Sequence, residues 1–234
     1  MLKYPQWGVR KVWALLRQPA YGMRVSTRRV WKLMRDLRQA FRNDNSESNQ
    51  ASKRVVVDDS NQRWATDFTK VWTKEDGQVT IVPTIDCGCR TLMAVEVVKS
   101  QTSESILASV DAALKKEFGD TTNLRQALEL RTDQGSQYVS QTCKDWAEKW
   151  NLNHTLAKKG TPTENAVVER VIRTMKEECI WPRDWNNVEE LRQALNKWHQ
   201  EYNEIRPHQA LNWSTPKQRR EENLARAQGG HKKI

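Results

Sequence analysis

The feature that most constrains the fold is the order of strand-type and helix-type patterns after residue 63. Three β-prone runs follow one another, at Trp64–Trp72, Val79–Asp86 and Thr91–Val98. A helical pattern then runs from Thr102 to Phe118, with Gly119 as its stop. Shorter segments alternate after it, and this order predicts a mixed sheet with helices on both faces. The later segments are expected to be a strand at Ala127–Thr132, a helix that Ser136 caps and that buries Val139, a strand at Asn153–Leu156, and helices at Glu164–Cys179 and Val188–Tyr202.

Three acidic residues lie where these elements would converge. Asp67 lies in the first strand, Asp133 directly follows the fourth at a glycine turn, and Glu169 lies on a helix. The element order is that of the α/β ribonuclease H-like fold, in which those two strands are neighbours. Carboxylate oxygens suit Mg²⁺, and two such ions can act on the attacking and leaving oxygens of a phosphoryl transfer. Each acid alone would be interpreted as a solvated surface residue, so the predicted metal site depends on all three together.

The helix around Glu169 carries basic residues on the same face. At about 100° per residue, Asn165, Glu169, Arg173 and Lys176 share one face, and an apolar arc beside them can pack on the sheet. A metal ligand followed by cations suits a DNA strand that crosses the helix. Arg173 and Lys176 are therefore predicted DNA contacts.

The excess positive charge lies in the first quarter of the chain. The formal net charge is +10; residues 1–54 hold 13 Lys and Arg against 3 Asp and Glu, whereas residues 55–234 hold 26 of each. A polyanion is the natural partner of such a segment. A solvated basic arm is the alternative that charge alone leaves open.

The basic segment has the pattern of two short helices. Val9, Val12, Trp13 and Leu16 have helical apolar spacing, and Pro19 and Gly22 then break it. A second helix follows a cap at Ser26 or Thr27, with an expected apolar stripe and a separate basic arc. This pattern favours a helix-turn-helix that binds DNA over an ordinary helical hairpin. The stripe consists of Val30, Leu33, Met34 and Leu37, and the basic arc of Arg28, Arg29, Lys32 and Arg35.

Composition separates the two regions. Residues 43–53 have no large apolar side chain, which is typical of a linker. We expect a helix-turn-helix segment at 1–42, a linker at 43–54, a ribonuclease H-like catalytic core at 55–204 and a C-terminal tail at 205–234.

Other classes of protein are disfavoured. No apolar run approaches the roughly 20 residues of a membrane span, and the N-terminus has no signal-peptide pattern, so a cytoplasmic location is expected. The cysteines and histidines show no zinc spacing, and the cysteines are expected to be reduced and buried.

Several motifs together resemble a known family. Residues 4–12 resemble the helix-turn-helix opening of the OrfB transposases of the insertion-sequence-three family, which belong to the DDE transposase and retroviral integrase superfamily. Trp64–Asp67 resembles the first catalytic motif of that family, residues 131–138 the second, and Asn165–Glu169 the third, with Lys176 at its basic position. The 35 residues between Asp133 and Glu169 match the family's spacing. The C-terminal signature is matched by Tyr202, Asn203, Arg206, His208, Leu211, Thr215 and Pro216.

The resemblance implies a function. Asp67, Asp133 and Glu169 would be catalytic and would hold two Mg²⁺ or Mn²⁺ ions. The enzyme would cleave the ends of an insertion sequence and then join the freed 3′-OH to another phosphodiester, without a protein nucleophile. The implied partners are DNA terminal repeats and target DNA, a second copy of the chain in a homo-oligomer, and the product of an upstream reading frame. The implied location is the bacterial nucleoid.

The chain also departs from the family pattern. Glu164 stands where many members have Asp, Val171 and Ile172 replace a commoner aromatic pair, and many relatives carry further sequence before the helix-turn-helix. Two alternatives stay open: an inactive DNA-binding remnant that regulates transposition, and a ribonuclease H-like nuclease without strand transfer.

Overall fold

The computed structural model describes residues 6–39, 57–119, 124, 127–157 and 165–229. The expected linker at 43–54 and the residue Glu164 lie outside these ranges. The helices are α1 (Val9–Arg17), α2 (Thr27–Gln39), α3 (Ser103–Phe118), α4 (Ser136–Val139), α5 (Gln141–Lys149), α6 (Ala166–Met175), α7 (Val188–Glu204) and α8 (Pro216–Gly229). The strands are β1 (Arg63–Thr66), β2 (Thr69–Thr73), β3 (Gly77–Asp86), β4 (Leu92–Val98), β5 (Leu128–Thr132) and β6 (Leu152–Leu156).

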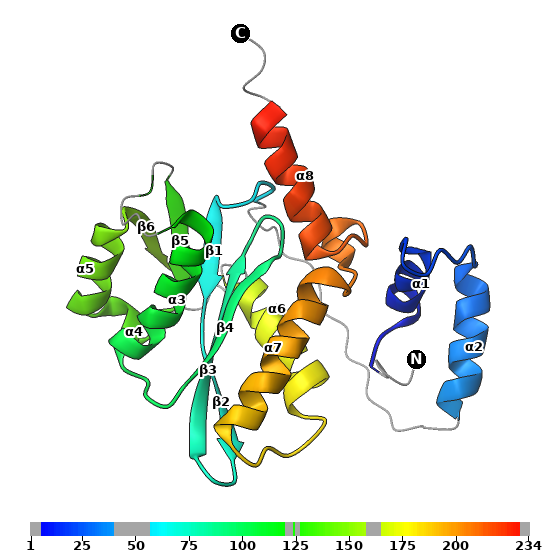
Figure 1. Cartoon of the computed structure of the whole chain (residues 1–234), viewed down its shortest axis with the longest axis horizontal. Coiled ribbons are helices and arrows are strands. Elements are labelled where there is room, and N and C mark those ends of the chain that lie inside the picture. The colour runs from blue at the N-terminus through cyan, green and yellow to red at the C-terminus, as the bar shows by residue number, and fades with distance from the viewer. Residues whose placement is uncertain (1–5, 40–56, 120–123, 125–126, 158–164, 230–234) are drawn as a thin grey trace.

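One mixed sheet organises the described part of the chain (Figure 1). The long strand β3 pairs antiparallel with β4 on one side and with β1 and β2 on the other. β1 then pairs parallel with β5, and β5 pairs parallel with β6. The predicted mixed sheet of a ribonuclease H-like fold, with helices on both faces, is confirmed.

The first predicted strand is interrupted at Asp67 and Phe68. The pairs Thr66↔Thr84 and Thr69↔Ile81 keep one register, so β1 and β2 are two halves of a single strand along β3. The same register places Asp67 opposite Pro83. The N–H of Cys87 donates to Arg63 O at 2.8 Å. In an antiparallel pair, every second residue of a strand donates its N–H to the same neighbouring strand. Position 83 is in phase with position 87, so it is the residue of β3 whose N–H would have to bond to Asp67. Proline has no N–H, which explains why the expected continuous strand is wrong at this point.

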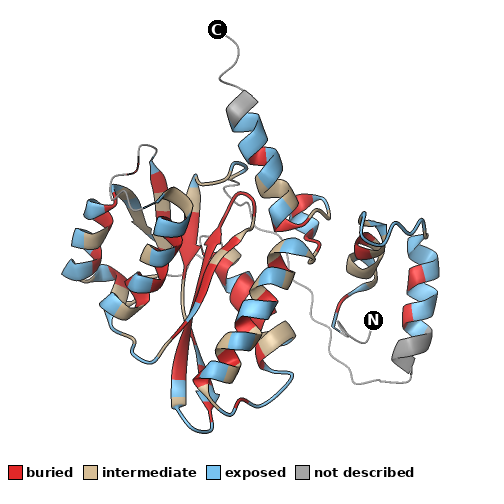
Figure 2. Cartoon of the chain, viewed as in Figure 1, coloured by how far each residue is buried: buried red, intermediate tan, exposed pale blue. Residues whose placement is uncertain are grey.

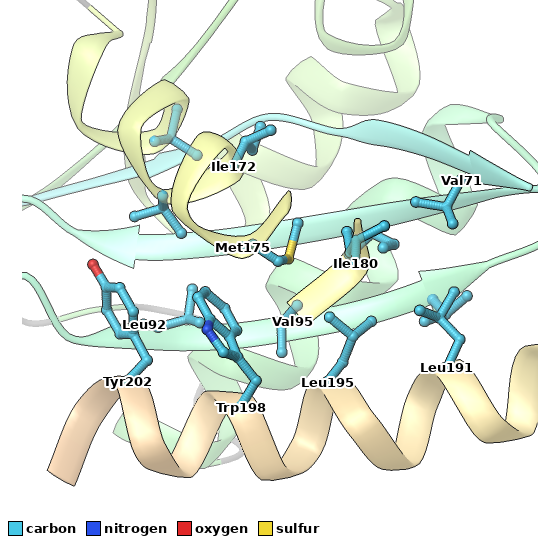
Figure 3. Packing of buried hydrophobic residues seen from close by; sticks show 14 of the residues in the cluster. Val71, Leu92, Val95, Ile172, Met175, Ile180, Leu191, Leu195, Trp198 and Tyr202 are labelled. Atoms are coloured by element: carbon cyan, nitrogen blue, oxygen red, sulfur yellow. The ribbon is translucent and has the colours of Figure 1, made fainter. Parts of the chain in front are cut away.

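Apolar cores form on both faces of the sheet (Figure 2). Adjacent residues alternate between them: Trp64 packs with α3 and α5, whereas Ala65 packs with α6 and α7. Figure 3 shows the core on the side of Ala65, where the α7 side chains Leu191, Leu195 and Trp198 face the sheet and α6.

Two expected helices differ in detail. The helix expected from Ser136 is divided into α4 and α5, because the Ser140 hydroxyl caps α5 by accepting from Cys143 N at 3.2 Å. Val139, expected to be buried, is 41% exposed beside this division. The helix that carries Glu169 continues past α6 into a π-helical turn at Lys176–Ile180, in which Trp181 N donates to Lys176 O at 2.8 Å.

The two N-terminal helices form as expected, with one correction. Val30 and Met34 are buried, but Leu33 is 57% exposed, so the apolar stripe of α2 is narrower than its spacing indicates. The basic residues Arg28, Arg29, Lys32 and Arg35 are all exposed. Among the described residues, no helix is long and apolar enough to cross a membrane.

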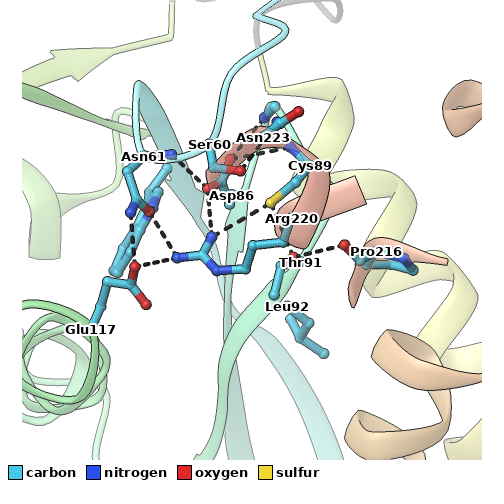
Figure 4. Close-up of polar contacts among 12 residues, drawn as sticks. Ser60, Asn61, Asp86, Cys89, Thr91, Leu92, Glu117, Pro216, Arg220 and Asn223 are labelled. Carbon is cyan, nitrogen blue, oxygen red and sulfur yellow. Dashed lines mark hydrogen bonds and ion pairs between the residues drawn. The ribbon is translucent and has the colours of Figure 1, made fainter. Parts of the chain in front are cut away.

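A buried polar cluster holds α8 against the sheet (Figure 4). Arg220 of α8 donates to Asp86 Oδ2 at 3.1 Å and also to Glu117 of α3. Asp86 is fully buried, and its other oxygen accepts from Gly88 N at 2.8 Å. The helix α8, which was not anticipated in the C-terminal tail, therefore neutralises a carboxylate at the end of β3.

Removing this cation should unfold the protein more readily. We expect Arg220→Ala to lower the free energy of unfolding by about 3–5 kcal/mol, because it leaves Asp86 buried without its charge partner. Lys217→Ala, on the same helix, removes a half-exposed ion pair with Glu204 and should cost less than about 1 kcal/mol. Urea unfolding of both variants measures the difference, and equal losses would show that the Asp86 pair does not hold α8.

Candidate active site

The sheet brings Asp67 and Asp133 to the same end of neighbouring strands. The parallel register of β1 and β5 pairs Ala65 with Arg131, and two residues further along it places Asp67 beside Asp133. Adjacent strands lie about 4.8 Å apart, so the two carboxylates start from neighbouring positions. Both residues lie just beyond the last paired residue of their strand, where the chain can turn toward solvent.

Backbone donors orient both carboxylates. Asp67 Oδ1 accepts from Phe68 N at 2.8 Å, and Asp133 Oδ1 accepts from Gly135 N at 2.9 Å. A Cβ atom at position 135 would lie only 3.0 Å from Asp133 Oδ1, so glycine lets the loop fold back onto the acid. The side chain of Gln134 donates to Ala157 O at 3.1 Å and ties this loop to the end of β6.

Glu169 reaches the same region from α6. This helix packs on β3 and β1 through a buried apolar face that includes Val168 and Ile172. Glu169 itself is exposed, and it lines one cleft of about 490 Å³ together with Asp67. The apolar arc predicted for this helix therefore packs on the sheet and leaves the acid at its edge.

The electrostatics of Asp67 show that the three acids act on one another. Burial, together with the negative charges of Asp133 and Glu169, raises the pKa of Asp67 to about 6, against the Phe68 N–H and Lys176, which lower it. Tyr138 is buried beside the same acids; burial raises its pKa, and Asp67 and Asp133 add to the effect. A carboxyl whose ionisation is opposed by burial and by neighbouring carboxylates, as for Asp67, is typical of a site that accepts a cation.

The chemistry of the site fits divalent metal ions. Its donors are carboxylate oxygens from separate elements, which Mg²⁺ and Mn²⁺ prefer. A cation would offset both the burial and the neighbouring negative charges that raise the pKa of Asp67. Within the described ranges, no three His, Cys, Asp or Glu side chains are already close enough to form a metal-binding cluster. Asp67 and Glu169 line the cleft, whereas Asp133 is not among its lining residues and lies beside Asp67 in the register of β1 and β5.

Cations and an aromatic ring surround the acids. Arg173 and Lys176, predicted as DNA contacts, both line the cleft; the Arg173 Nε atom is 2.8 Å from Glu177 Oε1. Trp181 also lines it and is 66% exposed. Sequence reasoning missed Trp181, because its place at the cleft depends on the π-helical turn before it.

The other predicted DNA contacts lie elsewhere. They belong to α2, which is separated from the sheet by α1 in Figure 1. The guanidinium of Arg35 lies 4.9 Å from the centre of the exposed Trp31 ring. The structure thus groups Arg173 and Lys176 with the acids and leaves the α2 cations on a separate surface.

Comparisons with known proteins agree with the sequence motifs. Two family models described as integrase core domain match residues 57–162 and 151–216. Transposase InsD for insertion element IS2A/D/F/H/I/K of Escherichia coli is 27% identical over 230 residues, covering 92% of this chain and 73% of that protein. Transposase InsD for insertion element IS2D of Escherichia coli strain K12 matches with the same identity and coverage.

Solved structures share the fold. The catalytic core domain of HTLV-2 integrase in complex with magnesium superposes with a TM-score of 0.52 at 18% identity, covering 72% of this chain and 99% of that one. A chain of the simian T-cell lymphotropic virus intasome in complex with PP2A regulatory subunit B56 gamma gives a TM-score of 0.59 at 17% identity, covering 84% and 67%. At these identities the likeness concerns the fold.

The raised pKa of Asp67 predicts a pH-dependent cost to folding. The pKa of this carboxyl is 3.8 in the unfolded chain and about 6 in the folded protein. Its contribution to the free energy of unfolding is therefore fully present below pH 3.8 and is lost as the pH rises through about 6. Asp67→Asn should therefore stabilise the metal-free protein at pH 8 by roughly 1–3 kcal/mol and have little effect at pH 4. Urea unfolding at both pH values measures this, with the exposed Asp184→Asn as control. If Asp67→Asn did not raise the free energy of unfolding at pH 8, ionisation of Asp67 would carry no cost to folding.

Proposed function

We propose that this chain, which belongs to the integrase core domain family, is a DNA transposase that cleaves insertion-sequence ends and transfers the freed strand. The observation that carries the proposal is the β1–β5 register, which sets Asp67 beside Asp133 while Glu169 faces the same cleft from α6. Three acids from three segments of the chain, with 35 residues between Asp133 and Glu169, fit metal-dependent phosphoryl transfer.

The roles of the residues follow from their positions. Asp67 and Asp133 would hold the divalent ions between them, and Glu169 would complete the second of two sites. Bound there, the ions would polarise the scissile phosphodiester and its attacking oxygen. Lys176, whose charge already acts on Asp67, would hold a phosphate of the DNA strand in the cleft. Because the acids serve as ligands, no protein nucleophile is required.

The N-terminal helices would supply DNA binding. The four cations of α2 are exposed, on the part of the chain that carries the whole positive excess. We propose that this segment binds duplex DNA at the terminal repeats. Two copies of the chain would bring the two ends together. The product of an upstream reading frame would be a further partner, so activity is measured for the chain alone and with that product added.

Substitution of the acids tests the catalytic proposal. Asp67→Ala, Asp133→Ala and Glu169→Ala should each reduce cleavage and strand transfer by at least about 10³-fold while duplex binding stays within about 3-fold, because the ligands act in the reaction rather than in binding. Strand-resolved products from the element's ends with Mg²⁺ are the measurement. Glu148→Ala, an exposed acid on α5, is the matched control.

The outcomes separate the alternatives. A wild-type chain that binds DNA ends but never cleaves them would indicate a regulatory remnant, and cleavage without joining would indicate a nuclease. Activity that persists in EDTA would contradict a metal-dependent site. Near wild-type activity in any one variant would remove that residue from the site.

Salt dependence tests the N-terminal helices. Changing Arg28, Arg29, Lys32 and Arg35 together to Ala should flatten the log–log salt slope of duplex binding by up to about 3.6, because each neutralised phosphate contributes about 0.9. Titration of wild type and variant against salt gives the slopes, and circular dichroism checks folding. An unchanged slope would mean that α2 faces solvent or a partner chain.

A further inference from the structure

A second cleft lies where α1 meets the core. It has a volume of about 840 Å³ and is lined by Arg10 and Lys11 of α1, Arg170 of α6, and Arg206 and His208 from the segment after α7. A smaller cavity of about 110 Å³ shares Arg170 and His208 with it and adds Arg90. The two hollows are therefore contiguous, and they lie on a different face of α6 from the cleft of Asp67 and Glu169.

The lining of this basic cleft is strongly cationic. Five Arg and Lys side chains line the two hollows, and no Asp or Glu is among their lining residues in the described part of the chain. His208 is deeply buried, and burial together with Arg206 and Lys11 keeps its pKa well below the usual value, so its ring is neutral at pH 7. Clustered like charges without a counterion inside the hollow favour an anionic ligand.

One carboxylate outside the lining pairs with cations of the cleft. Glu178 accepts from Arg206 Nε at 3.0 Å, from Trp7 Nε1 at 3.1 Å and from Trp198 Nε1 at 3.4 Å. Lys11 Nζ lies 3.6 Å from the same group. Burial, followed by the charge of Arg206, lowers the pKa of Lys11 to about 8, although the charge of Glu178 acts in the opposite direction.

Unpaired donors face the hollows. The Arg90 Nη1 atom is buried and has no hydrogen-bond partner within the described residues, on a residue held at φ +61°. Arg10 and Arg170 are exposed, and neither forms an ion pair with another described residue. Guanidinium groups with spare donors bind phosphate oxygens in bidentate geometry.

We propose that this cleft binds the sugar–phosphate backbone of a DNA strand, at a site separate from the catalytic cleft. The inference rests on the proposed function, because it takes DNA as the ligand. A strand held there would contact α1 and α6 at once, and Arg170 directly follows Glu169 in the chain. Binding of DNA by the N-terminal helices would thereby be linked to the helix that carries a catalytic acid.

The test uses two exposed residues whose loss should leave the fold intact. The double variant Arg10→Gln/Arg170→Gln is compared with Lys144→Gln/Lys149→Gln, which removes the same charge from exposed positions on α5 across the sheet. Fluorescence anisotropy with a labelled duplex, over a range of salt, is measured without divalent metal. The cleft variant should flatten the log–log slope of duplex affinity against salt by about 1.8, because it loses two phosphate contacts of about 0.9 each. Its duplex binding should weaken about 10-fold or more at low salt, whereas the control variant should match wild type.

The results distinguish failure of the inference from failure of the function. If the cleft variant matches the control while the α2 quadruple variant loses affinity, the cleft does not bind DNA and the proposed function stands. If wild type does not bind duplex at any salt, the proposed function itself fails. Labelled polyglutamate is titrated as a second probe. If the cleft variant loses binding of polyglutamate and keeps duplex binding, the cleft binds an acidic protein and the inference is overturned.

Discussion

Parallel pairing of β1 with β5 places two carboxylates of like charge at the same end of adjacent strands, and the remaining structure has to hold them there. Their repulsion contributes to the raised pKa of Asp67, so the site opposes folding when it is ionised. Apolar cores on both faces of the sheet offset that cost. Pro83 adds a local condition: without an N–H to pair beside Asp67, it leaves the strand open where the acid must turn outward. The site thus depends on packing well away from its own residues.

Sequence periodicity predicted most elements, because local patterns of apolar residues record which face is buried. Strand β3 and helices α3 and α7 were recognised this way. The gap between β1 and β2 was missed because it depends on a residue 16 positions away along the chain, Pro83, which meets Asp67 only when the sheet forms. The exposed Leu33 was missed for the opposite reason: helical spacing shows which residues share a face, not how wide a face the partner covers.

The acids of the site were named from order and spacing, whereas their surroundings required the structure. Asp67 and Asp133 end strands that sequence analysis could place, and the β1–β5 register then fixes their proximity. The ring of Trp181 and the cationic cleft beside α1 are assembled from segments distant in sequence. Arg220 likewise reaches Asp86 across 134 positions, and no local pattern marks that pair.

The π-helical turn at Lys176–Ile180 lets one continuous helical segment place Glu169 at the cleft and Ile180 in the apolar core. A turn closed by a bond between residues five apart holds one residue more than an α-turn, so everything after it is rotated by about 100° relative to a regular helix. Before the turn, the phase of the helix is set by Glu169 at the cleft that it shares with Asp67; at the end of the turn, the phase is set by Ile180 in the core. Deleting one residue here to give a regular α-helical turn would rotate Ile180 by about 100° relative to Glu169 and put these two ends out of step. A gain in local order would therefore be a loss of alignment between the acid at the cleft and the apolar core.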